Sequence, residues 1–372
     1  MTCDRCEEAA RQGCRFCPGC GEPLDSCTLC AEYARQGYEY CGRCGRHLVD
    51  DGDEGKKDDH IVEKTVFIAV PCITALLVVE ALCMLWWSGE TFGWLASRTF
   101  NVFLLLPQMV TIGSISGGTL QAFWVFLVIA VLASCLLLAY QSRTVVDRKA
   151  PRYIERIKTA PVYWVALMFG AYLVLSIAIS ALEGALGYHI VTPEGLPTGT
   201  GPQAVFSYAE AAVWEEVVSR IIPIGIPMVV VAGLCGRRDC LRYLLGGFGM
   251  TRVALVLMVV SAVIFGMAHE GSWGAWKILP TVVAGLMMSY LYIRFGVHAS
   301  IVFHFLMDYS VIASEAIGHE LFSFIFILVA ITGFVAVYGL FKYMREGASN
   351  IESMPVWVRD QMPEESNGSN LD

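Results

Sequence analysis

Residues 120–140 read LQAFWVFLVIAVLASCLLLAY and contain no charged side chain. An apolar helix of about 20 residues matches the hydrocarbon thickness of a bilayer. Similar runs predict eight membrane-spanning helices, at 64–87, 120–140, 161–182, 205–234, 252–269, 276–294, 297–314 and 320–342. The apolar segment 92–118 is broken by Pro107 and several glycines, so we expect it to form a re-entrant or interfacial piece, or a ninth span. The fold class that follows is all-α, a polytopic bundle over residues 64–345.

The composition of the whole chain agrees with a membrane protein. Of 372 residues, 56% are hydrophobic and 16% are charged, and the mean hydropathy is +0.56. A soluble fold cannot bury so much apolar surface, so a bilayer must cover part of it. Residues 1–59 differ from the rest, because they are polar and lack the apolar stretch of a signal peptide. We therefore expect this part to lie in the cytoplasm.

The N-terminal part contains a repeat of cysteine pairs. The spacing C-x2-C-x10-C-x2-C occurs twice with an offset of 24 residues, and Ala-Arg-Gln-Gly recurs at 10–13 and 34–37. In the reducing cytoplasm such pairs indicate metal ligands, and four thiolates make a closed, structural zinc site. The sequence predicts tandem zinc ribbons over residues 1–48, with two zinc ions held by Cys3, Cys6, Cys17, Cys20, Cys27, Cys30, Cys41 and Cys44.

The charge around the ribbons bears on their partner. The first 60 residues carry 13 Asp or Glu against eight Lys or Arg, and each four-thiolate zinc site adds negative charge. A phosphate backbone would be repelled, which disfavours nucleic acid and favours a cytoplasmic protein partner or a purely structural role. Residues 49–63 are interpreted as an acidic linker, and residues 346–372 as a disordered tail.

The basic residues predict the orientation in the membrane. Lys and Arg gather in the loops 141–160 and 236–252, whereas the loop 183–203 has none. By the positive-inside rule, the chain is a multi-pass protein of the cell membrane with both termini in the cytoplasm.

Ionisable side chains inside predicted spans are candidate functional groups, because burying them in lipid is unfavourable. Glu215, Glu216 and Arg220 lie in the fourth span, and His269 ends the fifth. Glu216 and Arg220 are four residues apart, so on an α-helix they form an ion pair while Glu215 points about 100° away. A carboxylate in a partly dry cavity near histidines suits a general base acting on water.

The seventh span adds His304 and Asp308, one helical turn apart, so that the carboxylate can orient the imidazole. The alternative for all these groups is that they only lock helices together. His298, near the start of the same span, is interpreted as a structural or interfacial residue.

Three motifs in these spans resemble those of the type II CAAX prenyl endopeptidase family, also called CPBP or ABI. Residues 215–220 fit Glu-Glu-x-x-x-Arg, residues 265–269 fit Phe-x-x-x-His, and residues 304–308 fit His-x-x-x-Asn/Asp. The resemblance covers about residues 160–315. It implies an intramembrane, metal-independent endopeptidase in which Glu215 activates water, His269 assists it, and His304 and Asp308 stabilise the oxyanion. Its substrate would be a membrane-associated protein or peptide, lipidated or not.

Two features depart from what the resemblance implies. Many members have Asn at the position of Asp308, and an ionised carboxylate cannot donate a hydrogen bond, so Asp308 must be protonated or act by orienting His304. The orientation above also puts His269 near the outer end of its span, whereas cytoplasmic substrate tails favour a cavity open to the cytoplasm. Either the site is reached from mid-membrane or outside, or the loop assignment is wrong.

Other functions fit the sequence motifs less well. A zinc metalloprotease signature is absent, because Trp273 stands where His-Glu-x-x-His needs its second histidine, although the same site residues have donors that a metal accepts. Residues 113–117 do not give the Gly-x-Ser-x-Gly of a serine nucleophile. The alternative from another class is a non-catalytic receptor, scaffold or transporter whose ribbons recruit a cytoplasmic partner.

Overall fold

The structure is a computed structural model, which describes residues 60–145, 157–190, 193 and 199–348. The predicted zinc ribbons, most of the acidic linker, and nearly all of the C-terminal tail lie outside these residues.

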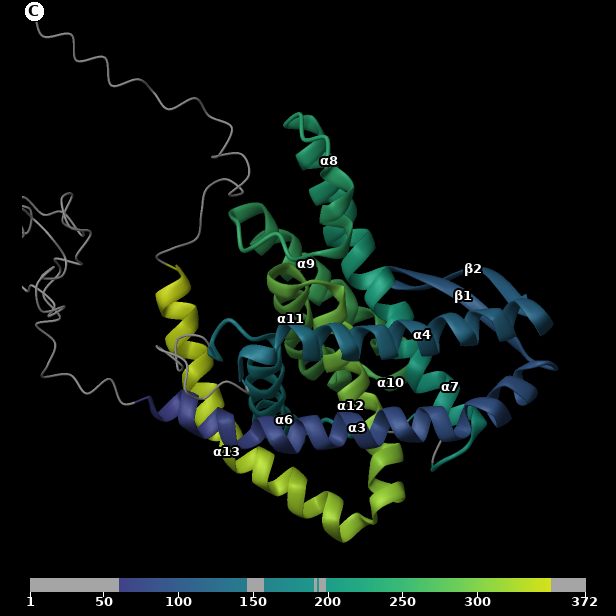
Figure 1. Ribbon diagram of the computed structural model, residues 1–372, viewed down its shortest axis with the longest axis horizontal. Coiled ribbons are helices and arrows are strands. Elements are labelled where there is room, and N and C mark those ends of the chain that lie inside the picture. The colour runs from purple at the N-terminus through teal and green to yellow at the C-terminus, as the bar shows by residue number, and fades with distance from the viewer. Residues whose placement is uncertain (1–59, 146–156, 191–192, 194–198, 349–372) are drawn as a thin grey trace, which may run out of the picture. The chain divides into compact units, whose positions relative to one another are not determined.

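Eight helical segments in the described part are long and apolar enough to cross a membrane (Figure 1). The first three are α3 (Ile61–Leu95), α4 (Gly117–Gln141) and α6 (Pro161–Ala185). The fourth joins α7 (Pro202–Glu210), η2 (Ala211–Glu215), η3 (Val217–Gly225) and α8 (Ile226–Leu234). The fifth and sixth are α9 (Arg252–Ala268) with α10 (Glu270–Trp273), and η5 (Ala275–Lys277) with α11 (Ile278–Phe295). The last two are α12 (Val297–Ile317) and α13 (His319–Ala348).

Each predicted span coincides with one of these helices, so the prediction of eight spans is confirmed for the described residues. The largest differences in length are at α3, which begins inside the predicted linker and continues eight residues beyond the predicted end. Two short 3-10 turns, η1 (Arg143–Val145) and η4 (Cys240–Leu245), lie in the loops after α4 and α8.

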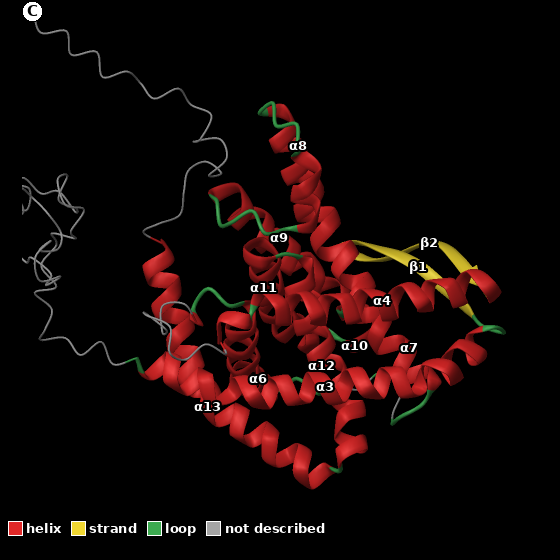
Figure 2. Cartoon of the chain, viewed as in Figure 1, coloured by secondary structure: helices red, strands yellow, loops and turns green. Residues whose placement is uncertain are grey.

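The segment between α3 and α4 is a β-hairpin, which corrects the all-α prediction and the expected re-entrant piece or ninth span at 92–118 (Figure 2). Strands β1 (Thr99–Leu106) and β2 (Gln108–Ser116) pair antiparallel, and Pro107 alone separates the pair Leu106 and Gln108. Pairing supplies the backbone hydrogen bonds that an irregular apolar segment would lack. The hairpin contacts α4 and α9, and the Phe103 carbonyl accepts a hydrogen bond from Trp214 Nε1 at 3.1 Å.

The fourth span is wound more widely than an α-helix around its charged residues, since η2 and η3 have π-helical backbone bonding. Pro223 contributes to this, because it has no N–H to donate to the carbonyl of Ser219, four residues earlier. That carbonyl instead accepts from Ser261 Oγ on α9 and from Arg220 at 3.2 Å. The hydroxyl of Ser219 donates to the carbonyl of Glu215. Side chains thus replace backbone donors at the point where the helix carries its charges.

Helix α12 lies in the interior of the bundle, where residues 298–306 are all buried and the helix contacts α3, α4, α6 and α11. At the periphery, α6 and α13 approach closely at glycines, because a Cβ added to Gly170 would lie 3.3 Å from the Cα of Gly333. Small residues of this kind let helices approach closely in lipid, where no hydrophobic effect drives their association. The core therefore positions α12, and with it two of the predicted site residues.

Candidate active site

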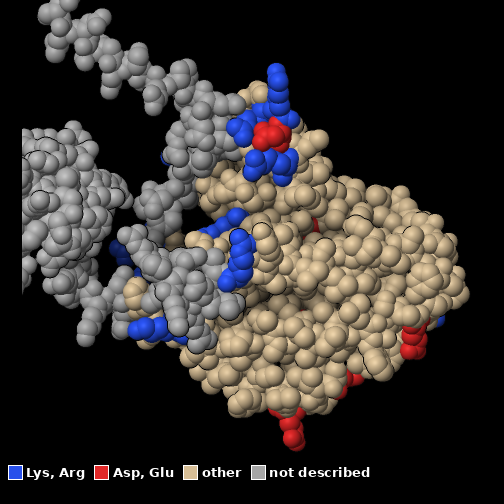
Figure 3. All heavy atoms as spheres, in the orientation of Figure 1, with Lys and Arg blue, Asp and Glu red and all other residues tan. Residues whose placement is uncertain are grey.

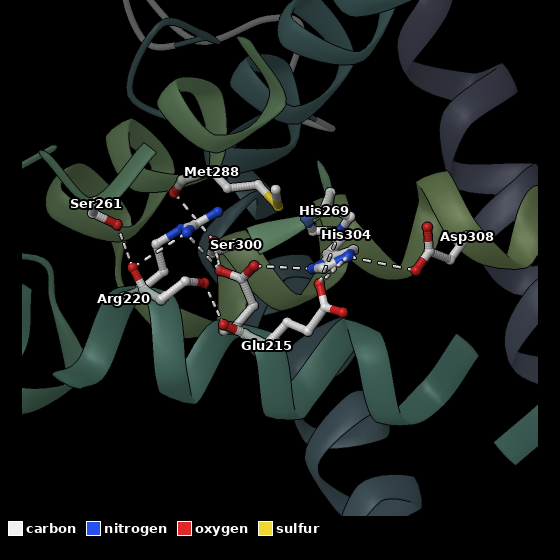
Figure 4. A network of polar contacts seen from close by, with 10 residues as sticks. Glu215, Arg220, Ser261, His269, Met288, Ser300, His304 and Asp308 are labelled. Carbon is white, nitrogen blue, oxygen red and sulfur yellow. Dashed lines mark hydrogen bonds and ion pairs between the residues drawn. The ribbon is translucent and has the colours of Figure 1, made fainter. Parts of the chain in front are cut away.

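The structure brings together the six predicted site residues from three spans (Figure 4). They are Glu215, Glu216 and Arg220 of the fourth span, His269 at the end of α9, and His304 and Asp308 of α12. Their spacing along the chain is large, and only the packing of α9 and α12 against the π-helical segment makes them neighbours.

Glu216 is fully buried and binds three of the surrounding side chains. Its Oε1 lies 2.9 Å from His304 Nδ1, its Oε2 accepts a hydrogen bond from Ser300 Oγ, and Arg220 Nε lies 3.4 Å from Oε2. The predicted ion pair of Glu216 and Arg220 is therefore present, with both side chains 0% exposed. A buried charge requires such compensation.

Arg220 is held by more than this ion pair. Its guanidinium carbon lies 4.8 Å from the centre of the Phe265 ring, in cation–π geometry, and NH1 donates to the Ser219 carbonyl at 3.2 Å. The Nε and NH2 groups have no hydrogen-bond partner among the described residues, so the contact with Glu216 is electrostatic rather than bidentate.

Glu215 has a different environment from its neighbour. One carboxylate oxygen, Oε2, lies 4.0 Å from His269 Nε2 and 3.8 Å from His304 Nε2, and the side chain is 13% exposed. These distances exceed direct hydrogen bonds and suit a shared water or substrate atom between the groups. The more accessible carboxylate is thus the one that faces two imidazoles.

The ring of His269 is oriented by its own helix. Nδ1 lies 2.8 Å from the Phe265 carbonyl, and since a carbonyl only accepts, Nδ1 carries the proton and Nε2 faces Glu215. The Phe265 ring also meets the rings of His269 and His304 edge to face, with centroids 4.8 Å and 6.1 Å away. Phe265 therefore contacts both imidazoles and Arg220.

Glycine is required next to Phe265 because α9 and α11 approach each other there. A Cβ on Gly266 would lie 2.9 Å from the Ile278 carbonyl, closer than side chains come to backbone. The close approach sets where α9 ends, and thereby where His269 lies.

Asp308 contacts His304 less closely than the sequence suggested. Its Oδ2 is 3.4 Å from His304 Nε2, whereas Glu216 Oε1 is 2.9 Å from Nδ1, so Glu216 makes the shorter contact that orients the ring. The Asp308 side chain is also 28% exposed, which makes it more accessible than the side chains of Glu215 and Glu216. His298 lies apart from this cluster, buried and 2.9 Å from Gln141 Oε1, in agreement with the structural role predicted for it.

Sequence reasoning missed several polar groups around the site. Ser300, one turn before His304, donates to Glu216 and to the Met288 carbonyl at 3.1 Å. Glu80 and Glu210 are buried inside predicted spans, with oxygens that lack a hydrogen-bond partner in the described part, and both interact electrostatically with Asp308. The rule that marks charged residues within spans would have found these two glutamates.

Glu210 belongs to the same backbone feature as Glu215. The two are five residues apart, and η2 between them has the i to i+5 bonding of a π-turn, which brings them toward one face.

The carboxylates and imidazoles of the site are side chains of the kind that bind metals. Within the described ranges, no group of three or more His, Cys, Asp or Glu side chains is arranged to hold a metal ion, and the eight predicted zinc ligands lie outside those ranges.

Comparison with known proteins adds a family to this geometry. The family model described as type II CAAX prenyl endopeptidase, Rce1-like, matches residues 197–310, which include all six predicted site residues. No curated protein and no solved structure matches the chain. The receptor and transporter alternative is not favoured by this match. Residues 197–310 therefore form an Rce1-like CAAX prenyl endopeptidase domain, and the chain is a multi-pass intramembrane protease.

Proposed function

We propose that the protein is a glutamate-dependent endopeptidase in which Glu215 is the general base. The observation that carries this proposal is the convergence of three spans on one carboxylate oxygen, with His269 Nε2 at 4.0 Å and His304 Nε2 at 3.8 Å. Glu216 is engaged by Arg220, His304 and Ser300, so it orients the site and does not act as the base.

The first chemical step uses a water molecule between Glu215 and His269. Atoms about 4 Å apart can be bridged by one water, and Nε2 of His269 accepts a hydrogen bond because Nδ1 carries the proton toward Phe265. Glu215 takes a proton from this water, and the oxygen of the water attacks the carbonyl carbon of the scissile peptide bond. Afterwards Glu215 gives that proton to the leaving amine, the C–N bond breaks, and the base is restored.

His304 stabilises the oxyanion of the tetrahedral intermediate. Its Nδ1 donates to Glu216, so Nε2 can donate to an oxyanion only when the ring carries two protons and a positive charge. Glu215, Glu216 and Asp308 surround this ring. Asp308, next to Nε2, donates to the same oxyanion when its carboxyl group is protonated.

The substrate is a membrane-associated protein with a prenylated C-terminal C-a-a-X tail, the class on which the matched family acts. An in-membrane site suits such a substrate, because the isoprenoid chain stays in lipid while the peptide reaches Glu215 from the middle of the membrane, as an orientation with His269 near the outer end of its span requires. Cleavage falls next to the lipidated cysteine.

The test is cleavage of a farnesylated C-a-a-X peptide by the full chain in liposomes. We expect Glu215→Gln, which keeps the shape and removes the base, to lower kcat at least about 100-fold, as loss of a general base does. His269→Ala and His304→Ala should each lower kcat by a comparable factor. Glu183→Gln is the matched control, because Glu183 is a buried carboxyl at the end of α6 that makes no contact with the site residues. Activity of Glu215→Gln equal to that of the control would refute the proposal.

A chelator separates the proposal from a metalloprotease. We expect cleavage to persist after chelation, since Glu215 and two imidazoles supply the chemistry. Loss of cleavage that zinc restores, in a variant lacking residues 1–59, would instead identify a catalytic metal.

The proposed orientation has the termini and the basic loops in the cytoplasm. Its support is the position of Arg237, Arg238 and Arg242 in the loop after α8, whereas residues such as Glu315 and Glu320 lie where α12 meets α13. In Figure 3 most of the visible Lys and Arg gather toward the side where α8 and α11 are seen. Labelling of Cys235, which is exposed in this loop, tests the orientation. A membrane-impermeant maleimide should label the peptide containing Cys235 only after cell lysis.

We also propose that residues 1–48 bind two structural zinc ions and recruit a cytoplasmic protein. The supporting observation is the repeat of four cysteine pairs at an offset of 24 residues. Metal analysis of the purified chain should give two zinc ions, and Cys3→Ser or Cys27→Ser should each remove one.

A further inference from the structure

The turn after His269 holds a lysine beside the site without pairing it to a carboxylate. In α10 and η5, Lys277 Nζ lies 4.2 Å from the Trp273 ring centre and 5.5 Å from that of Trp276, and the two rings meet edge to face at 6.1 Å. Among the described residues no carboxylate lies within 4.0 Å of Lys277. The tryptophans hold this cation in place and leave its hydrogen-bond donors available.

A second donor accompanies the lysine. Trp276 Nε1 is buried and has no acceptor in the part of the chain that the structure describes. A buried N–H without a partner is unfavourable, and it indicates that an acceptor from another molecule completes the arrangement. Lys277 Nζ lies 5.5 Å from the centre of the ring that carries this N–H, a separation that one carboxylate group is large enough to span.

The charge of Lys277 acts on the site. Lys277 interacts electrostatically with Asp308 and Glu215. Arg220 also interacts with Glu215, but its side chain is fully buried and already forms the ion pair with Glu216. A substrate anion entering the site therefore meets an available cation at Lys277.

The distance from the reacting carboxylates fits a short peptide. Helices α11 and α12 are joined at Gly296 and contact each other. Counted from Gly296, Asp308 is about 18 Å along α12 and Lys277 about 28 Å along α11, at 1.5 Å per residue. The difference, about 10 Å along the bundle, equals the reach of about three extended residues.

We propose that Lys277, with Trp276 Nε1, forms a subsite for the free C-terminal carboxylate of the substrate. In a C-a-a-X tail three residues separate a bond next to the lipidated cysteine from the terminal carboxylate, which matches the estimated separation. The subsite makes Lys277 a specificity-determining residue that positions the peptide end while Glu215 acts three residues away. This inference rests on the proposed function, because it assigns the substrate of that same site.

The test compares two farnesylated peptides of the same sequence, one ending in a free acid and one in an amide. We expect the wild type to prefer the acid by about 10-fold to 100-fold in kcat/KM, mostly through KM, as loss of a hydrogen-bonded charge predicts. Lys277→Met should bring this ratio to about one. Lys277→Arg should keep the preference, and Trp276→Phe should reduce it.

Arg98 provides the matched control, because its guanidinium stacks on Trp94 at 4.7 Å where α3 ends. Arg98→Met should leave the acid preference unchanged. An equal rate for both peptides in the wild type, or an unchanged ratio in Lys277→Met, overturns the subsite. Equal loss on both peptides in Lys277→Met and Lys277→Arg also overturns it, since the lysine is then structural. If the wild type cleaves neither peptide, the proposed function itself fails, and the subsite with it.

Discussion

Replacing Glu216 by Gln tests whether the buried ion pair is an electrostatic requirement of the fold. Gln has nearly the same shape, but its single oxygen can accept from only one of Ser300 and His304, and it leaves the charge of Arg220 uncompensated. Both partners are 0% exposed, so solvent cannot replace the lost carboxylate. The variant therefore isolates the charge from the packing.

The magnitude follows from the separation of 3.4 Å between Arg220 Nε and Glu216 Oε2. Two unit charges at this distance interact with about 5 kcal/mol at an effective dielectric constant of about 20. Breaking a buried pair by removing one partner costs about 3–5 kcal/mol. We expect the free energy of unfolding to fall by this amount in Glu216→Gln.

The double variant Glu216→Gln with Arg220→Met gives the decisive comparison. It removes both charges, and we expect it to recover most of the lost stability, because no isolated charge remains buried. It should stay inactive, since His304 Nδ1 no longer faces a carboxylate.

The assay is unfolding in mixed micelles with increasing SDS, followed by tryptophan fluorescence, beside cleavage of the farnesylated peptide. Glu183→Gln, which changes a buried carboxyl without an ion pair among the described contacts, should shift the free energy by less than about 1 kcal/mol. The reasoning is refuted if Glu216→Gln is no less stable than this control, or if the double variant is as unstable as the single one.

Three further substitutions have defined outcomes. Gly266→Ala places a Cβ 2.9 Å from the Ile278 carbonyl, so it should displace His269 and lower kcat at least about tenfold, and its activity at wild-type level would contradict the close approach of α9 and α11. Asp308→Asn should keep activity as the pH rises, because an amide donates at every pH while a carboxyl donates only when protonated; parallel pH profiles of kcat for the two proteins would contradict the oxyanion role. Glu80→Met should raise the free energy of unfolding by about 1–3 kcal/mol, because neither carboxyl oxygen of Glu80 has a described hydrogen-bond partner. A lower free energy of unfolding in SDS for this variant would contradict the absence of such a partner.

Apolar length predicted most of the membrane fold, because a bilayer imposes one requirement on every span. Apolar length did not predict the hairpin at 99–116, because Phe103, Leu104 and Leu105 are as apolar as a helical span. Only the pairing of the two strands distinguishes this segment from a helix. Pro107 did mark the break, but a proline does not tell which structure surrounds it.

The site residues were found by a different signal, which is charge inside apolar runs. It gave the ion pair of Glu216 and Arg220, but the angle expected for Glu215 assumed α-helical geometry, and the backbone there is π-helical. Pro223 was the available sign of this irregularity. The contact of Glu216 with His304 joins two spans, so spacing along either span could not predict it. Lys277 was overlooked because it lies at the end of a span, where lysine is ordinary.

The bond from Ser261 to the Ser219 carbonyl has a consequence for how a substrate enters. It ties α9 to the fourth span beside the charged residues, and Glu216 ties that span to α12 through His304. Separating these helices would break the Ser261 hydrogen bond and the contact of Glu216 with His304 inside the membrane, so we expect the three helices to move together. A lipidated chain must therefore enter past elements that carry none of these bonds. The hairpin and the turn with Trp273 and Trp276 are two described elements beside the site that take no part in these bonds between the three helices.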